Sequence, residues 1–298
     1  MIAVTCQDLS KTYSDKNALL KLNCTIAQDA ITGIIGRNGA GKTTLLKCIA
    51  GFYRPTEGTI RVFGQEPYDN LAVSAGLIFV DETMTFPDGQ SLAQILSLYS
   101  CFYPDWDAQL AEKLLAYFNL PAKQLPQKLS KGMLSTFRSI VGLCAHAPLT
   151  IMDEPTTGMD SGVRQDFYRA LLKDYIQHPR TLLISSHLLA EIEDLLEYVL
   201  LLDQGQVLLN APTTELATYA LALSGQSSQL EPFLANRTIL QKDCPLPDHL
   251  HVIIVNDLSP AETAALASSG ITTAAVSINE LCNALTATSK GGIDHVFA

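Results

Sequence analysis

Up to about residue 212, short apolar runs alternate with longer segments whose apolar residues have helical spacing. The apolar runs have the length of strands, and they lie at residues 31–35, 75–80, 149–152 and 181–184. Segments 44–50 and 162–176 instead place apolar residues three or four positions apart, as one face of a helix requires. Strands that alternate with helices in this way predict a wound α/β sheet.

Further strands are predicted on both sides of this core. Residues 1–30 form short strands with a turn at residues 14–17, and residues 59–64 form another strand that ends at Gly64. Toward the end of the region, we predict a helix over about residues 188–197 and then a hairpin over residues 198–209.

Two regions depart from the alternation of strands and helices. From about residue 86 to residue 147 the spacing is helical, which predicts a helical insert. Beyond residue 212 we expect a small α+β unit, with strands at residues 220–224, 238–241 and 251–256 and helices at residues 260–268 and 278–287. The prediction is therefore two domains, residues 1–211 and residues 212–298.

Composition narrows the possible environments and partners. The formal net charge is −10, which disfavours a nucleic-acid partner because such proteins usually carry a basic face. The seven cysteines are scattered without a C-x-x-C pair, as expected for thiols in a reducing compartment. No apolar run approaches the roughly 18 residues that a membrane span needs. We therefore expect a cytosolic protein, or one held at a membrane by another component.

One loop between a predicted strand and a predicted helix fits the pattern G-x-x-x-x-G-K-[ST]. Its residues are Gly36, Arg37, Asn38, Gly39, Ala40, Gly41, Lys42 and Thr43, and Thr44 continues into the helix. Glycines let backbone N–H groups turn toward a polyphosphate, and the helix N-terminus adds positive potential. Lys42 would bind the β and γ phosphates, and the Thr43 hydroxyl would coordinate Mg²⁺. The alternative is a glycine-rich turn that binds nothing, which the flanking strand and helix disfavour.

Two acidic residues follow the apolar run at residues 149–152. Hydrolysis of a nucleoside triphosphate needs a second magnesium ligand and a group that orients water. By residue type, Asp153 supplies the first role and Glu154 the second. The alternative is that both residues lie at a solvated strand end without a function. The phosphate-loop pattern earlier in the chain disfavours it.

A second helix start carries candidate anion-binding groups. Ser130 is placed as an N-cap, and Gly132 allows close approach of a backbone. A serine before a helix is usually only a cap, so the functional interpretation of this segment depends on the other motifs of the chain.

The order of these motifs over residues 1–210 resembles that of an ATP-binding cassette (ABC) ATPase, the nucleotide-hydrolysing subunit of ABC transporters. Residues 36–43 are similar to the Walker A motif of this family, and residues 152–154 to the end of its Walker B motif. Residues 129–133 are similar to the signature motif in the Leu-Ser-Lys-Gly-Met form of bacterial members, and residues 157–160 to the D-loop.

The resemblance implies a fold and a set of residue roles. The fold is a P-loop core of mixed sheet and helices with an N-terminal antiparallel part and a helical insert, followed here by a small α+β C-terminal domain. Lys42, Glu154 and His187 would be catalytic, with His187 as the switch histidine, and Tyr13 would lie against adenine. An ordinary strand tyrosine and a core histidine are the alternatives for Tyr13 and His187.

The resemblance also implies cofactors and partners. ATP and Mg²⁺ would be bound between two cassettes, with Ser130 and Gly132 reaching the nucleotide of the second subunit, which we expect to be an identical copy. A separate transmembrane permease would hold the protein on the inner face of the cell membrane, contacting exposed apolar residues such as Phe102, Tyr103 and Trp106. The alternative is that these three side chains only pack the helical insert. The rival is a soluble ABC ATPase of the translation or repair type.

One position departs from the family pattern. Members usually carry a glutamine that binds magnesium after the strand corresponding to residues 75–80, whereas this chain has Val80-Asp81-Glu82 there. Asp81 or Glu82 would take this role, and we assign the third metal ligand to Asp81.

Overall fold

The computed structural model describes residues 1–14, 16–187, 189–235 and 237–287. The chain divides into two compact units, Met1–Asn210 and Ala211–Ala298, and each is described by itself. Unit 1 has the α/β architecture that the sequence predicts, so the predicted fold class is confirmed.

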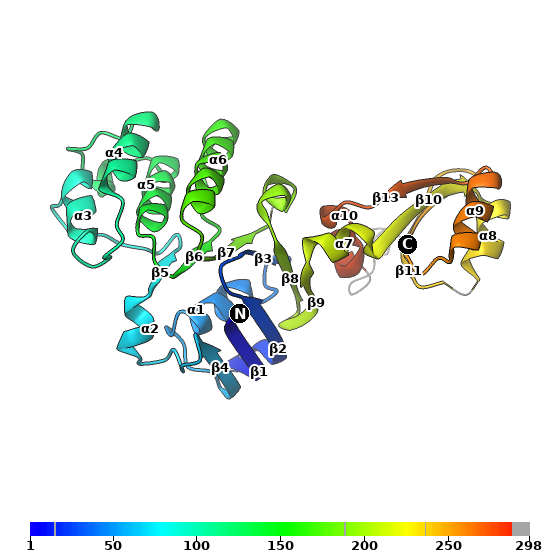
Figure 1. The fold of residues 1–298 in the computed structure, drawn as a ribbon, viewed down its shortest axis with the longest axis horizontal. Coiled ribbons are helices and arrows are strands. Elements are labelled where there is room, and N and C mark those ends of the chain that lie inside the picture. Colours follow the sequence, from blue (N-terminus) through cyan, green and yellow to red (C-terminus); the bar gives the residue numbers. More distant parts are fainter. Residues whose placement is uncertain (15, 188, 236, 288–298) are drawn as a thin grey trace. The chain divides into compact units, whose positions relative to one another are not determined.

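A six-stranded sheet forms the centre of unit 1 (Figure 1). Its order is β5 (Leu77–Val80), β6 (Leu149–Asp153), β7 (Thr181–Ser186), β3 (Ile31–Ile35), β8 (Tyr198–Asp203) and β9 (Gln206–Pro212). The pairs β5–β6, β6–β7, β7–β3 and β3–β8 are parallel. Strands β3, β5, β6 and β7 are buried at every position, which explains their unbroken apolar runs.

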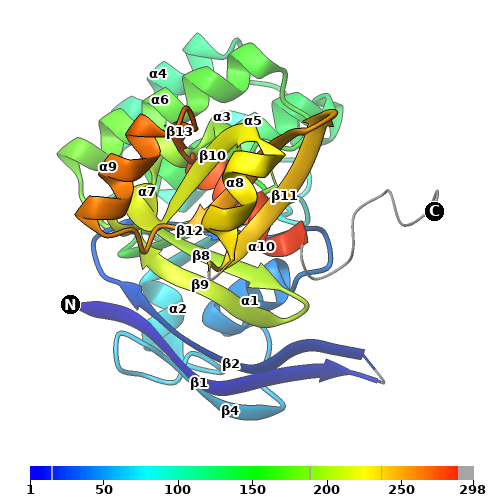
Figure 2. The ribbon, with the colours of Figure 1, turned by 90° about the vertical axis from the view of Figure 1, so that its right-hand side faces the viewer.

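A second, antiparallel sheet covers one side of helix α1 (Lys42–Ile49). It has the order β2 (Lys16–Ala27), β1 (Ile2–Tyr13) and β4 (Glu57–Val62). Helix α1 lies between the two sheets (Figure 2). Its Leu45, Leu46 and Ile49 belong to one buried apolar cluster with residues of both sheets, so the start of α1 is fixed from two sides.

The helical insert and its neighbours supply the remaining helices of unit 1. They are α2 (Leu71–Ala75), α3 (Leu92–Tyr99), α4 (Ala108–Tyr117), α5 (Lys131–Cys144) and α6 (Ser161–Gln177), with a short 3₁₀ turn at Pro126–Lys128. Side chains of Asn70, Ser91, Asp107, Ser130 and Asp160 cap these helices at their N-termini. Within the described ranges, no helix is both long and apolar enough to cross a bilayer.

The helix predicted over residues 188–197 is wrong. This segment forms two short 3₁₀ turns, Leu189–Glu191 and Glu193–Leu195. A continuous helix would place the carboxylates of Glu193 and Glu197 four positions apart, and like charges at this spacing destabilise a helix. Glu197 instead accepts hydrogen bonds from the Ile31 amide at 3.0 Å and the Tyr175 hydroxyl at 2.6 Å, which fixes the start of β3.

Unit 2 has a four-stranded antiparallel sheet with its own apolar core. The strand order is β11 (Ile239–Leu246), β12 (His249–Val255), β10 (Ala220–Gln226) and β13 (Thr272–Ala275). The helices are α7 (Thr213–Tyr219), α8 (Ser227–Leu234), α9 (Pro260–Ser268) and α10 (Ile278–Ala287). Leu250, Val252 and Ile254 lie in this core with Leu230 of α8.

Candidate functional site

The candidate residues of unit 1 come from the carboxyl ends of neighbouring parallel strands. The register pairs Val80 of β5 with Met152 of β6, and Asp153 with Ser185 of β7. Strand β3 continues the row, since Ile35 pairs with Ser186. Because parallel strands end at the same edge of a sheet, the segments that follow these four strands converge there.

The loop from Gly36 to Gly41 turns from β3 into α1 with two glycines in the left-handed region. Gly39 has φ 83° and Gly41, the N-cap of α1, has φ 106°. A Cβ atom on Gly41 would lie 2.7 Å from the Ala18 carbonyl oxygen, so this position is closed to larger residues. Arg37, Asn38 and Gly39 are exposed, as is Thr43 in the first turn of α1. The first N–H groups of α1 have no intrahelical partners and face the loop, which favours an anion.

Lys42 connects this loop with the end of β6. Its side chain is only 7% exposed. The ammonium Nζ donates to the Gly36 carbonyl oxygen at 2.7 Å and lies 3.7 Å from Oε1 of Glu154. The structure therefore brings together two predicted catalytic residues that are far apart in the sequence.

Glu154 also contacts the third predicted catalytic residue. Its Oε2 lies 2.6 Å from Nδ1 of His187, and because a carboxylate only accepts, Nδ1 is the donor. The His187 side chain is 51% exposed and that of Glu154 27%, so both are reachable from solvent. Glu154 has φ 50°, a backbone conformation that is uncommon for residues other than glycine.

Asp153 is buried next to Glu154 and is held by a residue that the sequence analysis did not assign. Ser185 Oγ donates to Oδ1 of Asp153 at 2.5 Å and accepts from the Glu154 amide at 2.9 Å. Ser185 thus fixes the carboxylate of one acidic residue and the backbone of the other. The signal was available, since a serine in a fully buried strand needs a polar partner.

Asp81 lies at the same edge, but its carboxylate is engaged. It accepts from the Thr83 amide at 2.9 Å and the Thr83 hydroxyl at 2.8 Å. Oδ2 also forms an ion pair with Nζ of Lys47, at 3.3 Å. Any metal contact through Asp81 would have to share the carboxylate with Lys47.

Tyr13 lies at the end of β1, close to the start of α1. Burial raises the pKa of Tyr13, while a hydrogen bond with the Thr44 side chain acts in the opposite direction. Its ring makes an edge contact with Tyr53 at 5.8 Å between centroids and is 40% exposed. The Lys11 ammonium lies over the Tyr13 ring, 5.4 Å from its centroid.

Ser130 and Gly132 start α5, where the D-loop passes. Ser130 Oγ accepts from the Met133 amide at 3.3 Å. A Cβ atom on Gly132 would lie 2.4 Å from the carbonyl oxygen of Gly158, so the backbone of Gly158 in the same chain approaches this position closely. Ser135 Oγ donates to the Thr157 carbonyl oxygen at 2.7 Å, which fastens α5 to the same loop.

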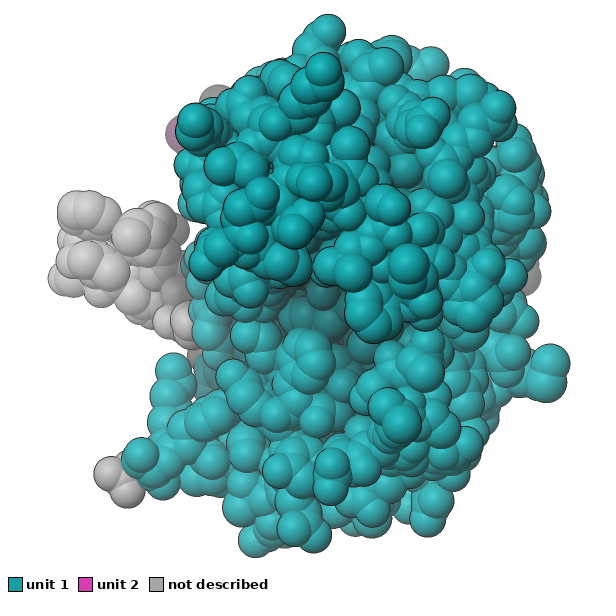
Figure 3. Space-filling model, turned by 90° about the vertical axis from the view of Figure 1, so that its left-hand side faces the viewer, with its two compact units in different colours: residues 1–210 teal, residues 211–298 magenta. Residues whose placement is uncertain are grey.

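The surface of unit 1 is hollowed on the side shown in Figure 3, where Figure 1 draws α2 and α3. A pocket of about 420 Å³ is lined by Phe52, Asp81, Met84 and Tyr103 among others. Of the three apolar residues predicted as partner contacts, Phe102 is exposed, at 68%, and the other two are half-buried. Tyr103 donates its hydroxyl to the Leu77 carbonyl oxygen at 3.2 Å and is half-buried.

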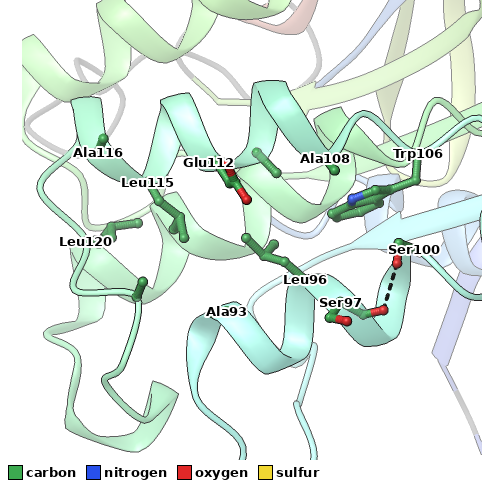
Figure 4. A pocket seen from close by; sticks show the side chains of 12 residues that line it. Ala93, Leu96, Ser97, Ser100, Trp106, Ala108, Glu112, Leu115, Ala116 and Leu120 are labelled. Atoms are coloured by element: carbon green, nitrogen blue, oxygen red, sulfur yellow. Dashed lines mark hydrogen bonds between the residues drawn. The ribbon is translucent and has the colours of Figure 1, made fainter.

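Trp106 faces a different pocket, inside the helical insert (Figure 4). This pocket of about 510 Å³ lies between α3 and α4 and is lined by alanine and leucine side chains, including Leu96 and Leu115, with the carboxylate of Glu112. The indole is half-buried, so it packs the insert in addition to offering a surface.

Comparisons with known proteins show what this chain is similar to. Residues 19–157 match the family model of the ABC transporter. The ABC transporter ATP-binding protein YtrB of Bacillus subtilis (strain 168) is 28% identical over 190 residues, which cover 64% of this chain and 65% of that protein. The match thus leaves about a third of that relative uncovered.

Solved structures share the fold. The structure of an ATP-binding subunit of an ABC transporter is 25% identical, with a TM-score of 0.63 over 72% of this chain and 91% of that one. A dimeric bacterial ABC transporter cassette has a TM-score of 0.61 at 20% identity, over 70% of this chain and 98% of the other. The matched segment and the shared fold thus make unit 1 similar to the ATP-binding proteins of ABC transporters.

Proposed function

We propose that this chain hydrolyses ATP as the nucleotide-binding subunit of an ABC transporter. One observation carries the proposal: Lys42 Nζ lies 3.7 Å from Glu154, and Glu154 lies 2.6 Å from His187. These contacts join the loop before α1 with the ends of β6 and β7. The three segments supply the residue types that phosphoryl transfer to water requires.

The loop before α1 is the proposed binding site of the triphosphate. The N-terminus of α1 and the Lys42 ammonium bring positive charge to one place, which favours a polyphosphate. The proposed ATP-binding residues are Tyr13, Gly36, Arg37, Asn38, Gly39, Ala40, Gly41, Lys42, Thr43 and Thr44. Within this set, Tyr13 would stack on the adenine, and its contact with Thr44 supports this assignment.

Mg²⁺ is the proposed cofactor because the nearby donors are oxygen atoms, which this ion prefers. The Thr43 hydroxyl and the Asp153 carboxylate would hold it, with Asp81 as a third, weaker ligand. When bound, Mg²⁺ would offset the negative charge of the phosphate oxygens. Ser185 prepares this site by orienting Oδ1 of Asp153.

Glu154 is the proposed general base. A carboxylate at this position would accept a proton from the attacking water, a role worth about 10²–10⁴-fold in rate. His187 donates its Nδ1 hydrogen to Oε2. Oε1, which lies 3.7 Å from Lys42 Nζ, would accept the proton of the water once Lys42 binds phosphate. Lys42 would bind the phosphate that carries the developing charge.

Two copies of the chain would complete the active site. Ser130 and Gly132 at the start of α5 would contact the ATP held by the second copy. The dimeric bacterial cassette with the same fold supports this arrangement. Hydrolysis would remove γ-phosphate contacts across the interface, and the dimer would open.

The transmembrane part would be a separate permease, which would hold the chain on the cytoplasmic face of the membrane. The pocket beside Asp81 and the exposed Phe102 are the proposed docking surface. YtrB is named as a transporter protein, which favours transport over the translation or repair function considered above.

The test is the variant Glu154→Gln, which keeps the hydrogen bond with His187 possible but removes the base. We expect ATP turnover to fall by about 10²–10⁴-fold. ATP binding should persist, and an ATP-dependent dimer should accumulate in size-exclusion chromatography.

The exposed Glu112→Gln on α4 is the matched control and should keep wild-type turnover. Retained turnover in Glu154→Gln would refute the assignment of the base. Purification from membranes without any polytopic partner would refute the transport role.

A further inference from the structure

A second cluster of ionisable side chains lies at the opposite end of β6. It consists of His146 in the loop before β6, Asp174 in the last turn of α6, and His178 at the C-cap of that helix. Nε2 of His146, a carboxylate oxygen of Asp174 and Nδ1 of His178 all lie within 4.8 Å of one another. The proposed ATPase mechanism uses none of these residues.

Two imidazole nitrogens flank one carboxylate oxygen, and these are the three donor atoms. Oδ1 of Asp174 lies 2.8 Å from His146 Nε2 and 3.4 Å from His178 Nδ1. A zinc ion about 2.0–2.1 Å from each donor in tetrahedral geometry would hold such atoms about 3.3 Å apart. Small side-chain shifts would therefore bring the cluster to the spacing of a metal site.

Arg180 holds the carboxylate without using the oxygen that faces the histidines. Its Nη2 lies 2.8 Å from Oδ2 of Asp174, too poorly aligned for a hydrogen bond, so that this buried oxygen keeps unused bonding capacity. The guanidinium also donates to the carbonyl oxygens of Leu143 and His178, at 3.1 and 2.9 Å. Arg180 thus orients the carboxylate of Asp174, as residues that contact metal ligands from outside the coordination sphere commonly do.

The cluster is open to solvent on one side only. Asp174 is 3% exposed and His146 8%, but His178 is 48% exposed. His146 and His178 line a pocket of about 480 Å³ together with Asp105 and Asp107. These two carboxylates add negative charge beside the donors, which favours a cation and offsets the guanidinium.

We propose that His146, Asp174 and His178 bind one divalent transition-metal ion of the zinc type, with water from the pocket as the fourth ligand. Two imidazoles and one carboxylate suit Zn²⁺ and its neighbours better than Mg²⁺, which prefers oxygen donors. The ion would link the loop before β6 to the end of α6, away from the proposed ATP site. Its role would be to stabilise unit 1.

The test uses the full chain without a polyhistidine tag, treated with a chelator and then titrated with Co²⁺ or Zn²⁺. We expect one Co²⁺ per chain, with the absorption of a tetrahedral nitrogen and oxygen site and no sulfur charge-transfer band. Zn²⁺ at about a hundredfold excess over its Kd should raise Tm by about 5 °C or more.

His178→Gln removes one ligand at a half-exposed position that the fold tolerates. This variant should bind the metal at least about tenfold more weakly and lose the Tm shift. His249→Gln in unit 2 is the matched control and should behave as wild type. Absence of stoichiometric binding, equal affinity in His178→Gln, or a sulfur band would overturn the proposal.

Discussion

The two ends of strand β6 carry similar residue types with very different access to solvent. At the carboxyl end, Glu154 is 27% exposed and His187 is 51% exposed. At the amino end, Asp174 is 3% exposed and pairs with Arg180, which is itself nearly buried. The contrast shows that the two carboxylates differ in access. Solvent reaches Glu154 directly, whereas Asp174 has a buried counter-charge in Arg180.

Backbone strain does not separate the two ends. Glu154 has φ 50°, and His146, before the other end of β6, has φ 44°. Both are left-handed residues other than glycine, and such residues often mark functional sites. At these two positions the strain is shared, so the functional difference must come from burial and from the charges nearby.

The largest expected effect is a loss of stability at the amino end of β6, where Asp174 is buried. Asp174→Asn leaves Arg180 without its counter-charge and should lower the free energy of unfolding by about 3–5 kcal/mol. Urea unfolding in chelator can be followed by the single tryptophan, Trp106, which lies in unit 1. The exposed Asp105→Asn should cost less than about 0.5 kcal/mol. Equal stability of wild type and Asp174→Asn would contradict the claim that the two ends of β6 differ in how their acidic residues contribute to stability.

The same variant predicts a pH dependence. Burial raises the pKa of Asp174, but the hydrogen bond from His146 and the charge of Arg180 more than offset it, and the net pKa is lowered. A lowered carboxyl pKa contributes stability that is present above about pH 4 and is lost as pH falls through the folded-state value. The stability difference between wild type and Asp174→Asn should therefore shrink below about pH 4, and a constant difference would contradict this account.

The second-largest effect is expected on ATP turnover, at the carboxyl end of β6. Lys42→Ala removes the ammonium that contacts Gly36 and Glu154 and should reduce ATP turnover by about 10²–10³-fold. Thermal stability should change little, because Glu154, the carboxylate that loses this partner, is 27% exposed. Lys113→Ala, an exposed lysine of α4, is the control. Unchanged turnover in Lys42→Ala would show that this lysine of the loop takes no part in ATP hydrolysis.

The smallest effect is expected at Asp81, which lies at the open edge but is already paired with Lys47. Asp81→Asn should raise the Mg²⁺ concentration for half-maximal turnover by about tenfold. Asp69→Asn, at an exposed position, is the comparison. An unchanged Mg²⁺ dependence would mean that Asp81 only holds Lys47 and Thr83.

Segments with a strong local pattern could be predicted from the sequence. The helices at Pro260–Ser268 and Ile278–Ala287 begin and end where the spacing of their apolar residues indicates. Three elements of unit 2 were not predicted, α7, α8 and β13. Helix α8 contains Pro232, which disfavours a helix locally, and β13 is exposed at every position and becomes a strand by pairing with β10.

The loop from Gly36 to Thr43 and the acidic pair after β6 could be found without a structure, because glycine spacing and strand periodicity are local properties of the chain. Which of these groups meet depends on how the chain folds. Lys42 reaches Glu154, and Gly158 approaches Gly132, because parallel strands end at one edge and α5 packs on the loop after β6. These contacts join residues distant in the chain, and no local pattern encodes such distances.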